Sequence, residues 1–188
     1  MINLISKNRF NTYPWKNGKG KTTELAINEG ASLAHFDWRI SIAEVSEDGF
    51  FSDFTGYQRN LVLIAGREIK LCHDRETRDH LTHTLDFATF SGNSSTHAVL
   101  PSGPIIDFNI VTKTDKYQVH LTTHNKQRQI AIAENGLSFA YSLASDLTVF
   151  QAGNAKCMLR QGDLLQIENE HALTVHGTKL IIVHLTTK

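Results

Sequence analysis

Residues 38–43 read Trp-Arg-Ile-Ser-Ile-Ala, so that large apolar side chains alternate with charged or small ones. Such alternation is typical of a β-strand, because successive side chains point to opposite faces of a sheet. Residues 105–111 read Ile-Ile-Asp-Phe-Asn-Ile-Val and contain the same alternation. Each segment can therefore bury one apolar face. Four polar residues lie on the opposite faces of these two predicted strands: Arg39, Ser41, Asp107 and Asn109.

Short apolar or alternating runs recur along the rest of the chain between Gly, Asn, Asp and Ser, and no long amphipathic helix pattern is present. In the first half we expect strands over residues 60–65, 68–72 and 81–87, with a turn at Gly66. After Asn135 the pattern predicts six more short strands: residues 137–143, 147–150, 156–160, 163–168, 172–175 and 179–185. The sequence therefore predicts an all-β protein, built as a sandwich or a barrel.

The predicted strands fall into two groups. Residues 1–112 form one expected β-module and residues 130–188 a second, and we expect two barrels joined by the polar stretch 113–129. A weak internal similarity supports a duplication, since Leu61–Leu71 and Leu147–Leu159 each read as a strand, a glycine turn and a second strand. We expect the two modules to pack as one compact unit.

Composition excludes several classes of protein. The 188 residues include 40% hydrophobic ones, and 19 basic residues balance 19 acidic ones, so no net field steers the chain to nucleic acid or to an anionic membrane. The longest apolar runs, such as residues 61–65, are too short for a signal peptide or a membrane span. Cys72 and Cys157 form no CxxC motif and are expected to be reduced thiols. These features predict a cytoplasmic protein.

The 10 histidines invite a search for a metal site, but their spacing does not favour one. His80 and His83 are three residues apart in a predicted strand, so their side chains leave opposite faces. His120 and His124 can face the same way, yet no nearby carboxylate or thiolate completes a ligand set. We therefore expect no metal and no other cofactor.

Two further catalytic motifs are absent. Residues 17–22, Asn-Gly-Lys-Gly-Lys-Thr, lack the first glycine of a phosphate-binding loop, and the polar residues before them do not form the required hydrophobic strand. We interpret this segment as a glycine-rich turn. No G-x-S-x-G motif marks a serine nucleophile, so neither nucleotide hydrolysis nor acyl transfer is expected.

Several blocks centred on Trp, Gly and Asp follow one another along residues 10–112. They are Tyr13-Pro14-Trp15-Lys16-Asn17-Gly18, Thr23-Glu24, Phe36 to Ala43, Asp48-Gly49, Phe51-Ser52, Phe54, Gly56, Arg59, Gly66, Gly103-Pro104 and Asp107-Phe108-Asn109. In order and spacing this set resembles the HutD/Ves family, and Gly162-Asp163 continues the resemblance more weakly. Lys19, Phe50, Ser102, Val111 and Lys113 depart from the family pattern. The resemblance implies a bicupin, with two RmlC-like cupin β-barrels in one chain.

The resemblance also implies a function. HutD proteins are linked to bacterial histidine-utilisation loci, where the family is regarded as a modulator that binds an intermediate such as N-formylglutamate or urocanate. The Ves branch is associated with cold and stress response, and the sequence does not distinguish the branches. No established enzymatic activity comes with the family. A small-molecule ligand is the partner that we expect, and a homodimer is left open.

The residues that match the family blocks form a candidate ligand site: Trp15, Lys16, Asn17, Arg39, Ser41, Arg59, Asp107 and Asn109. Two arginines and a lysine suit a small carboxylate, which guanidinium groups bind through paired hydrogen bonds. The neutral polar side chains suit a formyl or amide group, and Asp107 has the alternative role of orienting an arginine. Simple solvent exposure of these residues, and a core role for Trp15, stay open. The alternative function is a metal-independent cupin isomerase or hydrolase, with Asp107 or a histidine as the base.

Overall fold

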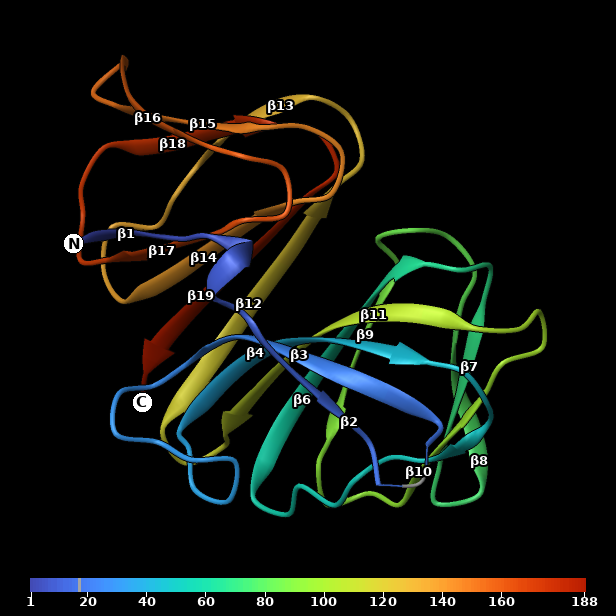
Figure 1. The fold of residues 1–188 in the computed structure, drawn as a ribbon. Helices are drawn as coiled ribbons and strands as arrows, with labels where there is room; N and C mark the ends of the chain where they lie inside the picture. Colours follow the sequence, from blue (N-terminus) through green and yellow to red (C-terminus); the bar gives the residue numbers. More distant parts are fainter. Residues whose placement is uncertain (17) are drawn as a thin grey trace. The chain divides into compact units, whose positions relative to one another are not determined.

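The computed structural model describes residues 1–16 and 18–188, and the chain divides into two compact units (Figure 1). The N-terminal unit comprises Phe10–Lys116, and the C-terminal unit comprises Met1–Arg9 together with Tyr117–Lys188. Each unit consists of two antiparallel sheets, so the all-β fold predicted from the sequence is confirmed. One helical element, the three-residue 3-10 turn η1 (Lys7–Arg9), occurs in the described chain. None of its described helices reaches the length and apolarity that a bilayer span requires.

The N-terminal unit pairs a six-stranded sheet with a four-stranded one. The large sheet has the order β2 (Asn11–Pro14), β3 (Gly20–Ile27), β4 (Trp38–Val45), β11 (Ile105–Lys113), β6 (Tyr57–Ala65) and β9 (Phe87–Ser91). The small sheet has the order β5 (Gly49–Phe50), β10 (Thr96–Val99), β7 (Ile69–His73) and β8 (Glu76–Leu81). Leu61 and Leu63 of the large sheet share a core with Ile69 and Leu71 of the small one. The hydrophobic effect therefore holds the two sheets face to face.

The C-terminal unit has the same plan. Its five-stranded sheet has the order β1 (Ile2–Ile5), β17 (Leu164–Glu168), β14 (Leu137–Ser142), β19 (Leu180–Thr187) and β12 (Tyr117–His124). Its four-stranded sheet has the order β13 (Arg128–Ala131), β18 (Leu173–Gly177), β15 (Leu147–Gln151) and β16 (Asn154–Leu159). Ala140, Leu165 and Ile182 of the large sheet pack with Val149 and Val175 of the small one.

Two consecutive runs of strands, β4–β11 and β12–β19, share one topology. In the large sheets β4-β11-β6-β9 corresponds to β12-β19-β14-β17, and in the small sheets β5-β10-β7-β8 corresponds to β13-β18-β15-β16. This arrangement fits the bicupin that the family resemblance implies. It also corrects the internal similarity proposed from the sequence, which matched β6 and β7 to β15 and β16. In the observed topology the counterparts of β6 and β7 are β14 and β15. Leu61–Leu71 crosses from one sheet to the other, whereas β15 and β16 within Leu147–Leu159 pair directly as a hairpin.

The unit boundaries differ from those expected from the sequence. Residues 2–5 pair with β17, which assigns the first residues of the chain to the C-terminal unit. Within the expected connector 113–129, residues 117–124 pair with β19 as strand β12. Tyr117, Val119 and Leu121 alternate there with polar residues, so the period of a strand is present in a segment of polar composition.

The strand expected over residues 81–87 is interrupted. β8 ends at Leu81 and β9 begins at Phe87. Between them one carboxylate oxygen of Asp86 accepts hydrogen bonds from the backbone N–H groups of Thr82 (2.9 Å) and His83 (2.8 Å). Asp often closes turns in this way, and here it overrides the apolar alternation.

Candidate functional site

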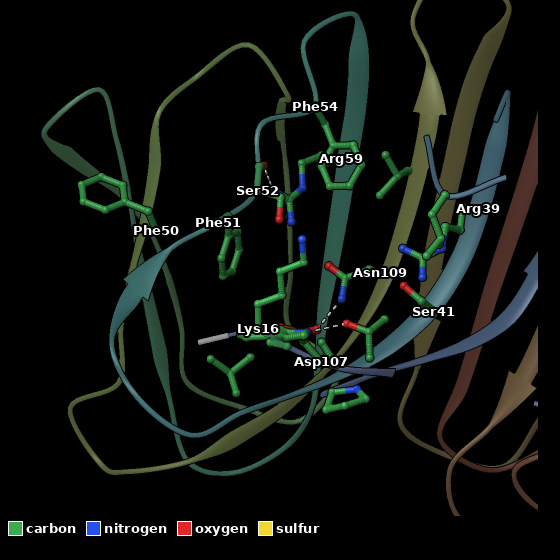
Figure 2. A pocket seen from close by; sticks show the side chains of 17 residues that line it. Lys16, Arg39, Ser41, Phe50, Phe51, Ser52, Phe54, Arg59, Asp107 and Asn109 are labelled. Carbon is green, nitrogen blue, oxygen red and sulfur yellow. Dashed lines mark hydrogen bonds between the residues drawn. The ribbon is translucent and has the colours of Figure 1, made fainter. Parts of the chain in front are cut away.

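A cavity of about 570 Å³ lies in the N-terminal unit and is lined by β4, β6, β11 and residues 50–54 (Figure 2). Its volume falls within the range of small-molecule sites. Seven of the eight candidate residues line it: Trp15, Lys16, Arg39, Ser41, Arg59, Asp107 and Asn109. The eighth, Asn17, lies outside the described residues. The structure therefore brings together the described candidates, while ligand binding by them stays a prediction.

Strand register explains how residues distant in sequence meet in this cavity. β11 lies between β4 and β6, and Val111 pairs with Arg39 on one side and with Arg59 on the other. One row further along the strands, Asn109 pairs with Ser41. Residues Ser41, Asp107 and Asn109 are 4%, 1% and 8% exposed, so these polar residues do not face bulk solvent.

Arg59 is a buried cation in an aromatic setting. Its guanidinium carbon lies 4.7 Å from the ring centroid of Phe51 and 5.2 Å from those of Phe54 and Phe90. Its Nη1 donates a hydrogen bond to the carbonyl oxygen of Ser52 (3.2 Å), whereas its Nε has no partner. Burial lowers the pKa of Arg59 to about 10, against the charge of Asp107, so the group stays cationic at neutral pH.

Asp107 is the acidic counterpart within the cavity. Its Oδ1 accepts a short hydrogen bond from the side-chain amide of Asn109. Burial raises the pKa of Asp107 to about 7, although Asn109, the charge of Arg59 and the backbone N–H of Ala43 oppose the shift. The carboxyl group therefore exists in both protonation states near neutral pH.

The second arginine of the cavity is already paired. Arg39 Nε donates to Glu24 Oε2 at 2.8 Å, and these two side chains are 11% and 15% exposed. Only its Nη atoms are left for a ligand, so Arg59 is the stronger candidate for binding an anion. Lys16 is an exposed residue that lines the cavity, and its amine reaches into it (Figure 2).

Trp15 is both a cavity wall and a core residue. Its Nε1 donates to Thr22 Oγ1 at 2.8 Å, and its ring packs against the core of the unit. A Cβ on Gly20 would lie 3.0 Å from the Trp15 ring and would collide with the backbone carbonyl of Glu44. Glycine at the first position of β3 is therefore required mainly by the close approach of the Glu44 carbonyl on β4, and it also leaves room for the Trp15 ring.

Sequence reasoning missed the aromatic residues around Arg59 and the partner of Arg39. Phe51, Ser52, Phe54 and Glu24 stand in the quoted family blocks, yet they received no role. The clustering of three aromatic residues within positions 50–54, shortly before an arginine, was the available signal.

The described residues offer little to a metal ion. No group of three or more His, Cys, Asp or Glu side chains among them is placed to bind one. In the cavity, Asp107 is the sole residue of these four types within the described lining.

Comparisons with known proteins agree with this fold. A sequence model of the HutD family matches residues 7–183. An uncharacterised 21.2 kDa protein in the hutC 3′ region of Pseudomonas putida is 34% identical over 173 residues, which cover 92% of this chain and 90% of that protein. Protein Ves of Citrobacter koseri is 33% identical over 137 residues, covering 71% and 69%. The structure of HutD from Pseudomonas fluorescens SBW25 (formate condition) superposes with a TM-score of 0.84 at 29% identity and covers 100% of both chains.

These matches extend over nearly the whole chain and include both units. The order of blocks around Trp15, Arg39 and Asp107 is thus explained by common descent: the chain belongs to the HutD family.

Proposed function

We propose that the N-terminal unit binds a small carboxylate in its cavity and that the protein acts as a non-enzymatic modulator of histidine utilisation. The observation that carries the proposal is the buried guanidinium of Arg59, whose Nε has no partner. Burial of an unpaired cation costs several kcal/mol, and an incoming anion offsets this cost. Arg59 therefore favours an anionic ligand.

The rest of the cavity restricts the ligand further. Lys16 supplies a second cation, Ser41 and Asn109 supply neutral polar groups, and Trp15 and Phe51 supply apolar walls. A carboxylate on a small body with an additional polar group matches this lining. N-formylglutamate and urocanate have this chemistry. The relative named for the hutC 3′ region supports a histidine-pathway ligand over the stress role of the Ves branch.

A cytoplasmic location is part of the same proposal. Cys72 and Cys157 are both free thiols, which suits a reducing compartment.

A thermal-shift and calorimetry panel tests the proposal with formate, N-formyl-L-glutamate, urocanate and L-glutamate. At 100 times its dissociation constant, a ligand of the native state adds about 2.7 kcal/mol. For a chain of this size the melting temperature then rises by roughly 5–11 °C. Absence of both heat and thermal shift with every compound would reject carboxylate binding.

The matched variant is Arg59→Met, which keeps an unbranched, apolar stem among Phe51, Phe54 and Phe90 but removes the guanidinium and its charge. We expect the unliganded protein to be as stable as the wild type or more so. Affinity should fall by about 10- to 100-fold, since a charge-assisted hydrogen bond contributes ~1.5–3 kcal/mol.

One observation favours a second candidate, a metal-independent enzyme. A buried carboxyl group with a pKa of about 7, such as Asp107, is suited to general acid–base catalysis. Incubation of each panel compound with the protein in D₂O, followed by proton NMR, separates the two functions. Conversion or deuterium incorporation that is lost in Asp107→Asn would establish an enzyme, whereas unchanged spectra with measurable binding support the modulator.

A further inference from the structure

Asp107 stands alone as an acidic group in the described lining of the cavity. Asp107 is 1% exposed, and the ion pair within 4.0 Å that the described lining holds joins Arg39 to Glu24, so the charge of Arg59 acts on Asp107 from beyond that distance. Its Oδ1 is occupied by the amide of Asn109. A buried carboxyl group that shares a cavity with two arginines and a lysine would ordinarily be ion-paired, so the lack of a close cation here needs a reason.

The charges that face Asp107 come from four elements. Arg59 on β6 is cationic, Arg39 on β4 is neutralised by Glu24 on β3, and Lys16 follows β2. Asn109, its neighbour on β11, is neutral. The cavity thus holds two cations without a close carboxylate, and a ligand carboxylate that binds them enters the same enclosed space as Asp107.

Two carboxylates in one poorly solvated site repel, and one of them takes up a proton. Building on the proposed function, we propose that Asp107 is a specificity-determining residue that is protonated whenever the cavity holds a carboxylate and donates a hydrogen bond to that ligand. One proton then enters the cavity with each ligand. Because Asn109 donates to Oδ1, the proton belongs on Oδ2.

The identity of the protonated partner follows from burial. Burial already raises the pKa of Asp107 to about 7 in the empty cavity, whereas a ligand carboxylate next to Arg59 is stabilised as the anion. With that pKa, about 90% of the molecules carry the proton at pH 6 and about 10% at pH 8. The apparent affinity for a carboxylate should therefore fall about tenfold from pH 6 to pH 8.

Formate is a suitable probe, because it stays fully ionised over this range and fits any part of the cavity. We would measure its dissociation constant at pH 6 and pH 8 by NMR titration. The wild type should show the tenfold loss. Asp107→Asn places a neutral donor at the same position, so it should bind formate at pH 8 as tightly as the wild type does at pH 6, with no pH dependence.

Asp115→Asn is the matched control. Asp115 is exposed and lies outside the cavity lining, so its removal should preserve the tenfold loss. A second measurement avoids substitutions: the carboxyl carbon resonance of Asp107 in the wild type should titrate at a higher pH when formate is present.

The outcomes separate the two proposals. Equal formate affinity at pH 6 and pH 8, or weaker binding by Asp107→Asn at both, overturns the role of Asp107 and leaves carboxylate binding intact. A formate titration without any binding at either pH overturns the role of Asp107 as well. In that case the proposed function itself is decided by the larger carboxylates of the panel.

Discussion

The two units share one strand order but differ in what the middle of the large sheet presents to the interior. In the N-terminal unit β11 contributes Asp107 and Asn109 to the cavity. In the C-terminal unit the corresponding strand, β19, contributes Leu180 and Ile182 to an apolar core. The same topology therefore tolerates either a filled core or a charged cavity. The strand order secures the fold, whereas the side chains of one face determine whether there is a site.

The C-terminal unit also has polar groups on the interior face of its large sheet, but these groups are neutral and hydrogen-bonded. His184 pairs in register with His120, and its Nδ1 shares a hydrogen bond with Ser138 Oγ at 2.8 Å. Burial, together with the charge of His120, lowers the pKa of His184 and favours its neutral form. Burying neutral groups that have hydrogen-bond partners costs little free energy, whereas burying the charges of the N-terminal unit lowers the stability of the fold.

The largest expected effect comes from placing a carboxylate in the apolar unit. Ile182→Asp puts a charge without a partner on β19, and we expect a loss of more than ~4 kcal/mol. Hydrogen exchange should show loss of amide protection across the strands of the C-terminal unit. Retained protection would mean that the interiors of both units accommodate a carboxylate, which would contradict the proposed difference between an apolar core and a charged cavity.

The next largest effect is the loss of folding stability that ionisation of Asp107 causes as the pH rises. The folded-state pKa of about 7 exceeds the value near 4 of an unfolded Asp, so the folded chain keeps a proton that the unfolded chain loses between pH 4 and 7. Stability therefore falls as the pH rises through this window. Because Asn cannot ionise, Asp107→Asn should be more stable than the wild type at pH 8, by a few kcal/mol, and equally stable below about pH 4.

Tryptophan fluorescence during urea unfolding measures this difference in the relevant unit, because both tryptophans, Trp15 and Trp38, lie in the N-terminal unit. A variant that is less stable at pH 8 would show that the ionised carboxylate stabilises the fold.

A smaller effect distinguishes the two arginines of the cavity. Arg39→Ala leaves Glu24 mostly buried and without its partner, which should cost about 1–3 kcal/mol of stability. Arg39→Lys should recover part of the loss, since it restores the charge but not the planar group. Urea unfolding and formate titration of both variants check this assignment. Unchanged stability with lost binding would make Arg39, rather than Arg59, the principal ligand residue.

The smallest expected effect is on metal content. The described lining of the cavity offers a metal the single carboxyl of Asp107, so purified protein should contain no stoichiometric transition metal. Elemental analysis after mild chelation measures this directly. About one equivalent of retained metal would contradict the expectation and would favour a metal-dependent cupin.

The sequence by itself predicted the all-β class, many of the strands and the two faces of the central ones. Alternation around Trp38 and Phe108 placed Arg39, Ser41, Asp107 and Asn109 on one side, because a period of two is a local property of the extended chain. Family blocks added Trp15, Lys16 and Arg59. The turn at Asp86 escaped prediction because one side-chain hydrogen-bonding pattern outweighed the apolar alternation.

Only the tertiary structure decided which charges are free. Strand pairing brings Arg59 beside β11, and the close packing of Phe51, Phe54 and Phe90 removes its guanidinium from water. Burial likewise raises the pKa of Asp107, while Glu24 neutralises Arg39. Burial and ion pairing depend on residues distant in sequence, and no local pattern encodes them. For the same reason the pairing of β1 with β17, which assigns the first residues to the C-terminal unit, could be known only from the folded chain.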